Sequence, residues 1–158
     1  MIRKALPLTA LIAFTSSVLF TSCDKTDDVS TTRALIADWK PSKIYVDNGN
    51  GVLDADEIKN AYEFKTDLGT LQFKDNQTGI YNTSGGWTNV LYPLTFFGRN
   101  ADFTWSVNDR TQELTVTEIN KNPKTTKLHF RDVNSFAILQ SDSSQFAPMS
   151  YWFFFEKK

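Results

Sequence analysis

Oxygen-bearing side chains gather between residues 46 and 57, with the spacing of a calcium-binding loop. Such a loop holds calcium with oxygens at positions one, three, five, seven, nine and twelve and has glycine at position six. Counted from Val46, the sequence offers Asn48, Asn50, the Val52 carbonyl, Asp54 and Glu57 as ligands, with Gly51 as the glycine. The first position holds valine, so Asp47 would have to substitute from the next position. The pattern predicts a calcium site, and calcium is the only cofactor that it suggests.

The same stretch also has a purely structural interpretation. The run from Asp47 to Gly51 alternates aspartate, asparagine and glycine, which is the strongest turn signal in the chain. Asp54 would then be the N-cap residue of a short helical turn, and Glu57, three residues later, would complete a capping box. The sequence leaves both interpretations open.

Aromatic side chains form a second group that could bind a ligand. Trp87, Tyr92, Phe96 and Phe97 lie in a glycine-flanked segment that would form a lid over a barrel mouth. Aromatic rings offer large apolar contact at low entropic cost, which suits a lipid, a sterol or a sugar ring. Alternation along the strands adds the predicted interior residues Phe64, Phe73, Phe103, Trp105 and Phe130 as the lining of a pocket. The alternative is a self-packed loop that closes the barrel end.

The residues of common catalytic sites are missing from the sequence. His129 is the only histidine, and it stands between Leu128 and Phe130 in a strand pattern that directs it to the opposite face. No Ser-His-Asp set, phosphate-binding glycine loop or zinc spacing can be assembled. The carboxylates form no pair suited to glycoside hydrolysis. We therefore predict a protein that is not an enzyme.

The first residues predict export. Arg3 and Lys4 precede an apolar run from Ala5 to Phe20, which is typical of a secretory signal. The run is shorter than the roughly 20 apolar residues of a membrane span. It leads into Leu19-Phe20-Thr21-Ser22-Cys23, which resembles the lipobox of bacterial lipoproteins. The resemblance implies that residues 1–22 are removed and that Cys23 is lipidated; an ordinary signal peptide with a free cysteine is the alternative.

Residues 23–33 are polar and without periodicity, so we predict a flexible tether. The acidic cluster from Asp24 to Asp28 looks like the signal that sends Bacteroidota-type lipoproteins to the outer face of the outer membrane. A plain solvated linker is the alternative. The predicted location is the cell envelope, with the membrane as a partner through the lipid anchor, because two or more acyl chains hold a protein on a membrane.

Composition limits what the mature chain can be. Without Arg3 and Lys4, 15 basic residues face 18 acidic ones, so there is no basic footprint for nucleic acid. The single cysteine excludes a disulfide within the chain. Thirteen phenylalanines supply enough apolar material for one core. We predict one domain, residues 34–158, held together by packing.

Alternating apolar and polar residues mark this domain as all-β. A helical turn is expected at 34–39, ended by Pro41, before a strand at 43–46. Further strands are predicted at 62–65, 71–74, 79–81, 102–107, 114–117, 127–130, 136–140 and 151–155, the first two of them joined as a hairpin. The last is apolar on both faces, so we expect it to be covered by the 87–97 segment or by a partner. About eight short strands with turns between them predict an antiparallel up-and-down barrel.

Several of these segments, in this order, also carry a family resemblance. They are Trp39, the Ile44-Tyr45 strand before the Asn/Gly turn, Tyr62-Glu63-Phe64-Lys65 with Gly69, Phe103 to Val107, Leu114 to Val116 and the closing aromatic strand. Together they look like the lipocalin-like domain family of Bacteroidota outer-membrane lipoproteins. The resemblance implies an eight-stranded barrel that can enclose one small ligand. Two functions remain open: binding of a small apolar or amphipathic molecule, or a solid-core module that docks onto an envelope protein complex.

Overall fold

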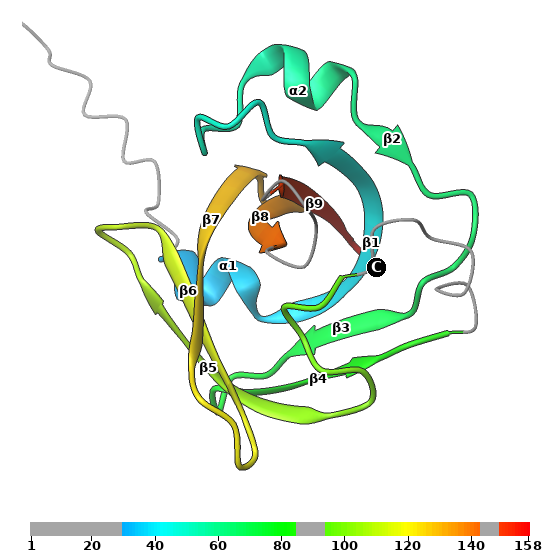
Figure 1. Cartoon of the computed structure of the whole chain (residues 1–158). Coiled ribbons are helices and arrows are strands. Elements are labelled where there is room, and N and C mark those ends of the chain that lie inside the picture. The colour runs from blue at the N-terminus through cyan, green and yellow to red at the C-terminus, as the bar shows by residue number, and fades with distance from the viewer. Residues whose placement is uncertain (1–29, 85–93, 143–148) are drawn as a thin grey trace, which may run out of the picture.

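The protein is a closed antiparallel β-barrel (Figure 1). The computed structural model describes residues 30–84, 94–142 and 149–158. The elements are α1 (Thr31–Leu35), β1 (Ala37–Val46), α2 (Ala55–Lys59), β2 (Tyr62–Glu63), β3 (Thr70–Phe73), β4 (Thr78–Asn82), β5 (Asp102–Asn108), β6 (Glu113–Glu118), β7 (Lys124–Asp132), β8 (Ser135–Asp142) and β9 (Met149–Lys157). Strands β3 to β9 pair in sequence order, and β9 pairs with β1 to close the barrel. Eight strands form the wall, and β2 is an extra strand on β1, so the predicted all-β barrel is confirmed.

Alternation along the strands places their apolar side chains in the barrel. In β5, Phe103 and Trp105 are buried while Asp102, Thr104 and Ser106 are exposed. In β6, Leu114 and Val116 are buried in the same way. Successive side chains on a strand point to opposite faces, so this period of two gives each strand one apolar face. The strands predicted at 79–81, 102–107, 114–117, 127–130, 136–140 and 151–155 are therefore confirmed.

The first strand differs from its prediction. The helix covers Thr31–Leu35 and begins within the segment expected to be tether, and β1 runs from Ala37 through Pro41. The predicted helical turn over 34–39 is wrong beyond Leu35, because Trp39 pairs as a strand residue with Leu71 and Lys157. Pro41 is tolerated because the β1–β9 register shifts between Pro41 and Lys43, and irregular positions accept a residue without an N–H.

The predicted hairpin between 62–65 and 71–74 is also corrected. β2 and β3 do not pair with each other, since both pair with β1 at different heights. Lys43 and Ile44 lie opposite Glu63 and Tyr62, and Ala37 to Trp39 lie opposite Phe73 to Leu71. Both residues of β2 are exposed, so this strand lies outside the core.

The two ends of the barrel differ. Strands β1, β4, β6 and β8 finish at one end, which we call the mouth; its described connections are segments 47–69, 94–102 and 118–124. At the other end, called the closed end, lie the short turns and both described chain termini, in segments 30–38, 74–77, 109–112, 131–134 and 156–158. Leu35 of α1 is fully buried at the closed end, and the Trp39 indole N–H donates to its carbonyl at 2.8 Å.

The outer face of β9 is covered by residues 55–61, which include α2 and which we call the α2 segment. Tyr151, Phe153 and Phe155 face the barrel core, whereas Trp152 and Phe154 belong to a second cluster with Leu53 and Ala137. Tyr45, Ile58, Ala61 and Leu139 pack against that second cluster. The two-faced apolar strand is thus covered on both faces, as predicted, with Leu53 and the α2 segment on its outer face. The described end of the 87–97 segment covers the inner face, where Phe97 packs against Phe155 with ring centroids 6.1 Å apart.

Candidate functional site

The mouth is the candidate functional site, because the longest connections meet there. Between β1 and β3 the chain makes the turn at 47–51, α2 and β2, and between β4 and β5 it runs from 83 to 101. The described turns at the closed end are much shorter. Binding residues are commonly carried on long loops that a rigid scaffold positions, which is the arrangement at this end.

Segment 94–97 closes the mouth from within, and we call it the stopper. Its backbone is held by two side chains from the barrel wall. The Gln140 amide oxygen on β8 accepts the N–H groups of Thr95 at 2.7 Å and Phe96 at 2.9 Å. The Lys124 ammonium on β7 donates to the carbonyls of Thr95 and Phe96, both at 3.2 Å. Leu94, Phe96 and Phe97 are buried as a result.

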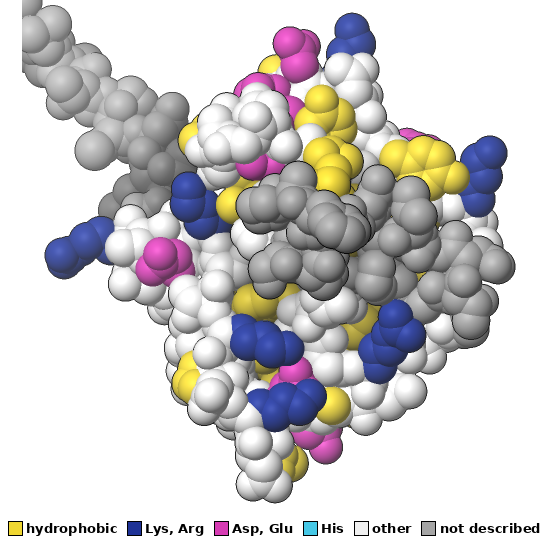
Figure 2. All heavy atoms as spheres, in the orientation of Figure 1, with side chains coloured by type: hydrophobic (Ala, Val, Ile, Leu, Met, Phe, Trp, Pro, Cys, Tyr) yellow, Lys and Arg dark blue, Asp and Glu magenta, His cyan; other side chains and the backbone are white. Residues whose placement is uncertain are grey.

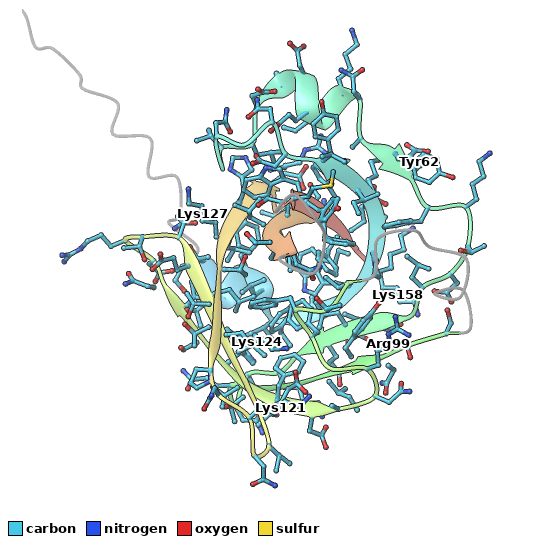
Figure 3. All side chains as sticks on the ribbon, in the orientation of Figure 1. Tyr62, Arg99, Lys121, Lys124, Lys127 and Lys158 are labelled. Carbon is cyan, nitrogen blue, oxygen red and sulfur yellow. The ribbon has the colours of Figure 1, made fainter. Side chains whose placement is uncertain are left out.

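A buried carboxylate supports this arrangement. The side chain of Glu118 is only 3% exposed, and it pairs with Lys121 and, at 3.2 Å, with Lys124. Figure 3 shows Lys124 at the start of β7 and Lys121 in the turn that precedes it. Burial alone would raise the pKa of Glu118, but the hydrogen bonds and charges of Lys121 and Lys124 outweigh it and lower that pKa below its ordinary value of 4.5. Gly98 lies against this group, and a side chain at that position would require the Glu118 carboxylate to move.

Most of the predicted pocket-lining residues form the packed interior. Phe73 is at the centre, with ring centroids 6.0 Å from Phe97, 5.7 Å from Phe103 and 5.2 Å from Trp105. Phe96 packs edge-on against Phe97 at 5.0 Å. Phe64 and Phe130 are partly buried against the same cluster. Trp87 and Tyr92 lie outside the described residues.

The polar atoms of the interior rings are engaged with the protein itself. The Trp105 indole N–H donates to the Thr78 carbonyl at 2.9 Å, and the Tyr81 hydroxyl donates to the Leu68 carbonyl at 3.1 Å. Among the residues that the structure describes, the only buried side-chain N or O without a hydrogen-bond partner is the hydroxyl of Ser135 on β8. These interior rings therefore have their polar atoms paired without a ligand.

The predicted calcium loop is a network of backbone caps. Asp54 caps α2 by accepting the Glu57 N–H at 2.8 Å, and the Glu57 carboxylate accepts the N–H groups of Asp54 at 3.3 Å and Asn48 at 3.2 Å. The capping-box interpretation is confirmed. The amide oxygens of Asn48 and Asn50 accept N–H groups two residues later in the chain. Within residues 30–84, 94–142 and 149–158, no three His, Cys, Asp or Glu side chains form a metal-binding group.

Asp47 has a role that the sequence did not reveal. One carboxylate oxygen accepts the N–H groups of Gly49 at 3.0 Å and Gly51 at 3.2 Å, which tightens the turn. The other accepts the indole N–H of Trp152, 105 residues away, at 3.1 Å. No local pattern could have indicated that partner, because the contact depends on β1 lying beside β9.

The described surface also carries open grooves, each of which includes residues of the mouth segments. One of about 520 Å³ runs beside β1 and β2 and includes Lys43, Phe64 and Lys65. Another of about 520 Å³ lies between β5 and the β6–β7 turn, beside Phe103 and Ile119. A third of about 510 Å³ follows the turn at 47–51. Figure 2 shows charged and apolar side chains intermixed on the face in view, without one dominant patch.

His129 lies on the outer face of β7, as the alternation predicts, and it is exposed. Partial desolvation and the neighbouring charge of Arg131 lower the pKa of His129. The His129 side chain therefore points away from the packed interior.

No protein-family model matches this chain, and no curated protein matches it either. Among the residues that the structure describes, no helix is long and apolar enough to cross a membrane.

Proposed function

We propose that this chain is the precursor of a lipid-anchored protein of the cell envelope, related to the lipocalin-like lipoproteins of Bacteroidota, and that it binds an envelope protein partner without catalysing a reaction. The signal pattern and the lipobox at Cys23 support the anchor and the outer-membrane location. The barrel is the scaffold in this proposal, and the loops of the mouth make the contact.

The observation that carries this proposal is that the protein's own side chains occupy the described interior. Leu35 and Trp39 enter the core from the closed end, and Phe96 and Phe97 enter it from the mouth. To admit a ligand, the stopper would have to leave. Exposing two phenylalanine side chains costs about 3–6 kcal/mol, and each of the four hydrogen bonds to Gln140 and Lys124 adds about 1 kcal/mol. A ligand would need to bury on the order of 300 Å² of apolar surface merely to offset this loss.

Site-specific crosslinking tests the proposed docking surface. Ile119 at the mouth and Val133 at the closed end are 73% and 64% exposed, so they form a matched pair. Each is changed to cysteine in the full-length chain and labelled with a benzophenone in cell envelopes of the host. The proposal expects a discrete protein adduct from Ile119→Cys that Val133→Cys does not give. Equal labelling from both positions, or none from either, contradicts docking through the mouth.

A small apolar or amphipathic molecule in the barrel is the second candidate. The observation that favours it is that the stopper is not a strand of the wall. In the described part of the chain, the hydrogen bonds to its backbone come from two side chains, those of Gln140 and Lys124. In this alternative, a ligand replaces Phe96 and Phe97 next to Phe73, Phe103 and Trp105.

Native mass spectrometry separates the two candidates. The barrel domain is purified from its host and measured before and after organic extraction. The docking proposal expects the bare polypeptide mass in both spectra. An extra mass that survives gentle ionisation and disappears on extraction would favour the interior ligand and identify its class.

A further inference from the structure

The described chain begins at the closed end of the barrel and is fixed there. Ser30 caps α1 by accepting the Arg33 N–H at 3.3 Å. The Gln112 side chain, in the β5–β6 turn, donates to the Thr31 hydroxyl at 3.2 Å. Leu35 is fully buried, so α1 cannot swing away without exposing the core. Whatever precedes Ser30 must therefore leave the molecule at the closed end.

We propose that the closed end faces the lipid surface and that the mouth points away from it. This orientation rests on the lipidation of Cys23 in the proposed function. Seven residue steps separate Cys23 from Ser30, and a chain of that length spans about 25 Å at most. A flexible chain of seven residues has an average end-to-end distance of only about 15 Å.

The barrel is too tall for the tether to allow the opposite orientation. β9 has nine residues, which at about 3.3 Å per residue and a tilt of about 40° gives a wall of about 23 Å. To bring the mouth to the bilayer, the tether would have to run almost fully extended along the whole wall. With the closed end towards the bilayer, the tether stays relaxed, so chain entropy favours that orientation.

Charge acts in the same direction on an anionic lipid surface. The closed-end segments hold six basic and five acidic residues, whereas the described mouth segments hold five basic and eight acidic ones. The acidic mouth residues are Asp47, Asp54, Asp56, Glu57, Glu63, Asp67, Asp102 and Glu118, of which Asp47, Glu57 and Glu118 are buried. Anionic headgroups therefore repel the mouth more strongly than the closed end, within the screening length of about 8 Å at physiological salt.

Fluorescence quenching on vesicles tests the orientation. Val133→Cys and Ile119→Cys are prepared in the mature lipidated protein, in which acylation leaves no thiol at Cys23 to react. Each is labelled with the same thiol-reactive fluorophore and added to phosphatidylcholine vesicles that contain phosphatidylglycerol and a nitroxide-labelled headgroup. We expect quenching of the Val133→Cys label to exceed that of Ile119→Cys several-fold. Equal quenching at the two positions, or stronger quenching of Ile119→Cys, overturns the proposal.

Two controls separate this inference from the proposed anchor. If the protein does not float with vesicles, or if the parent chain takes up label at Cys23, the lipidation itself is wrong. If it floats and the quenching pattern is reversed, only the orientation is wrong. A flexible insertion of about 20 Gly/Ser residues after Asp28 should reduce the difference between the two labels at least twofold. An undiminished difference would contradict the tether as its cause.

Discussion

At the residue scale, Asp47 shows how one carboxylate can organise two distant parts of the fold. Its side chain is almost fully buried, and it accepts hydrogen bonds from two glycines of its own turn and from Trp152 on β9. The turn thereby stays against the strand that closes the barrel. In the calcium interpretation, Asp47 would replace the ligand missing at the first loop position. In the structure, its carboxylate accepts hydrogen bonds from the protein itself.

We expect Asp47→Ala to lower the free energy of unfolding by about 2–3 kcal/mol, because the buried Trp152 indole and two glycine N–H groups then lose a charged acceptor. Trp152→Phe removes the partner N–H together with part of the buried ring. The two effects should be less than additive in Asp47→Ala/Trp152→Phe by about 1 kcal/mol or more, measured by urea denaturation. Asn50→Ala is the control, since Asn50 is exposed and its side chain accepts only the Val52 N–H. Additive effects would show that the Asp47–Trp152 hydrogen bond carries no coupling.

The Glu118 carboxylate predicts a specific dependence of stability on pH. Its pKa is lower in the folded protein than its ordinary value of 4.5, so ionised Glu118 stabilises the fold above that pH. The stabilisation is lost as the pH falls below 4.5 through the folded pKa. Glu118→Gln should therefore cost about 1–2 kcal/mol at pH 7 and progressively less below pH 4.5. Unfolding midpoints of both proteins across this range would check this, and a constant difference between them would contradict it.

At the element scale, alternation was a reliable guide where a strand has one face on the core. The period of two in Phe103 to Val107 and in Leu114 to Val116 predicted β5 and β6 together with their inward faces. The capping box at Asp54 was also readable, because its partners are three residues apart. These features are encoded locally, so the sequence alone was sufficient for them.

The sequence failed where long-range pairing determines local structure. Ala37 to Trp39 resemble a helical turn, yet β3 and β9 on either side hold them as strand. Tyr62 to Lys65 alternate like one arm of a hairpin, yet β2 pairs with β1. The interior position of Phe96 and Phe97 depends on Gln140, more than 40 residues later. No local pattern encodes these contacts.

Removing the side chain that accepts hydrogen bonds from the stopper should loosen this segment while the barrel stays folded. In Gln140→Ala the N–H groups of Thr95 and Phe96 lose their acceptor. Their hydrogen exchange should accelerate at least tenfold, while exchange in β5 and β6 stays unchanged. Exchange measured by NMR resolves these amides.

The Phe97→Ala variant should lose about 3–5 kcal/mol of stability, because it leaves a cavity among Phe73, Tyr81 and Phe103.

Thr126→Val serves as the comparison for the stopper variants, because Thr126 also lies on the barrel wall but does not contact segment 94–97 in any described hydrogen bond. Its hydroxyl donates to the Leu139 carbonyl, so the variant perturbs the wall and leaves the ties of the stopper in place. If Thr126→Val accelerates exchange at Thr95 as much as Gln140→Ala does, the stopper is not held by Gln140.

At the scale of the whole molecule, the barrel has two apolar clusters on opposite faces of the wall formed by β8, β9 and β1. Trp39 and Trp105 belong to the interior cluster, and Trp152 belongs to the cluster that the α2 segment covers. Both clusters depend on β9, since its alternate residues face one and then the other. Loss of β9 pairing would open the barrel and uncover the second cluster at once.

This shared strand predicts a single cooperative unfolding transition. β9 pairs with both β1 and β8, so loss of this strand disrupts both clusters together. We expect urea transitions followed by far-UV circular dichroism and by tryptophan fluorescence to coincide, as two-state behaviour requires. The fluorescence difference between the parent chain and Trp152→Phe isolates the signal of the outer cluster. If that signal changed at lower urea than the circular dichroism, the α2 segment would unfold independently and would not be part of the cooperative barrel.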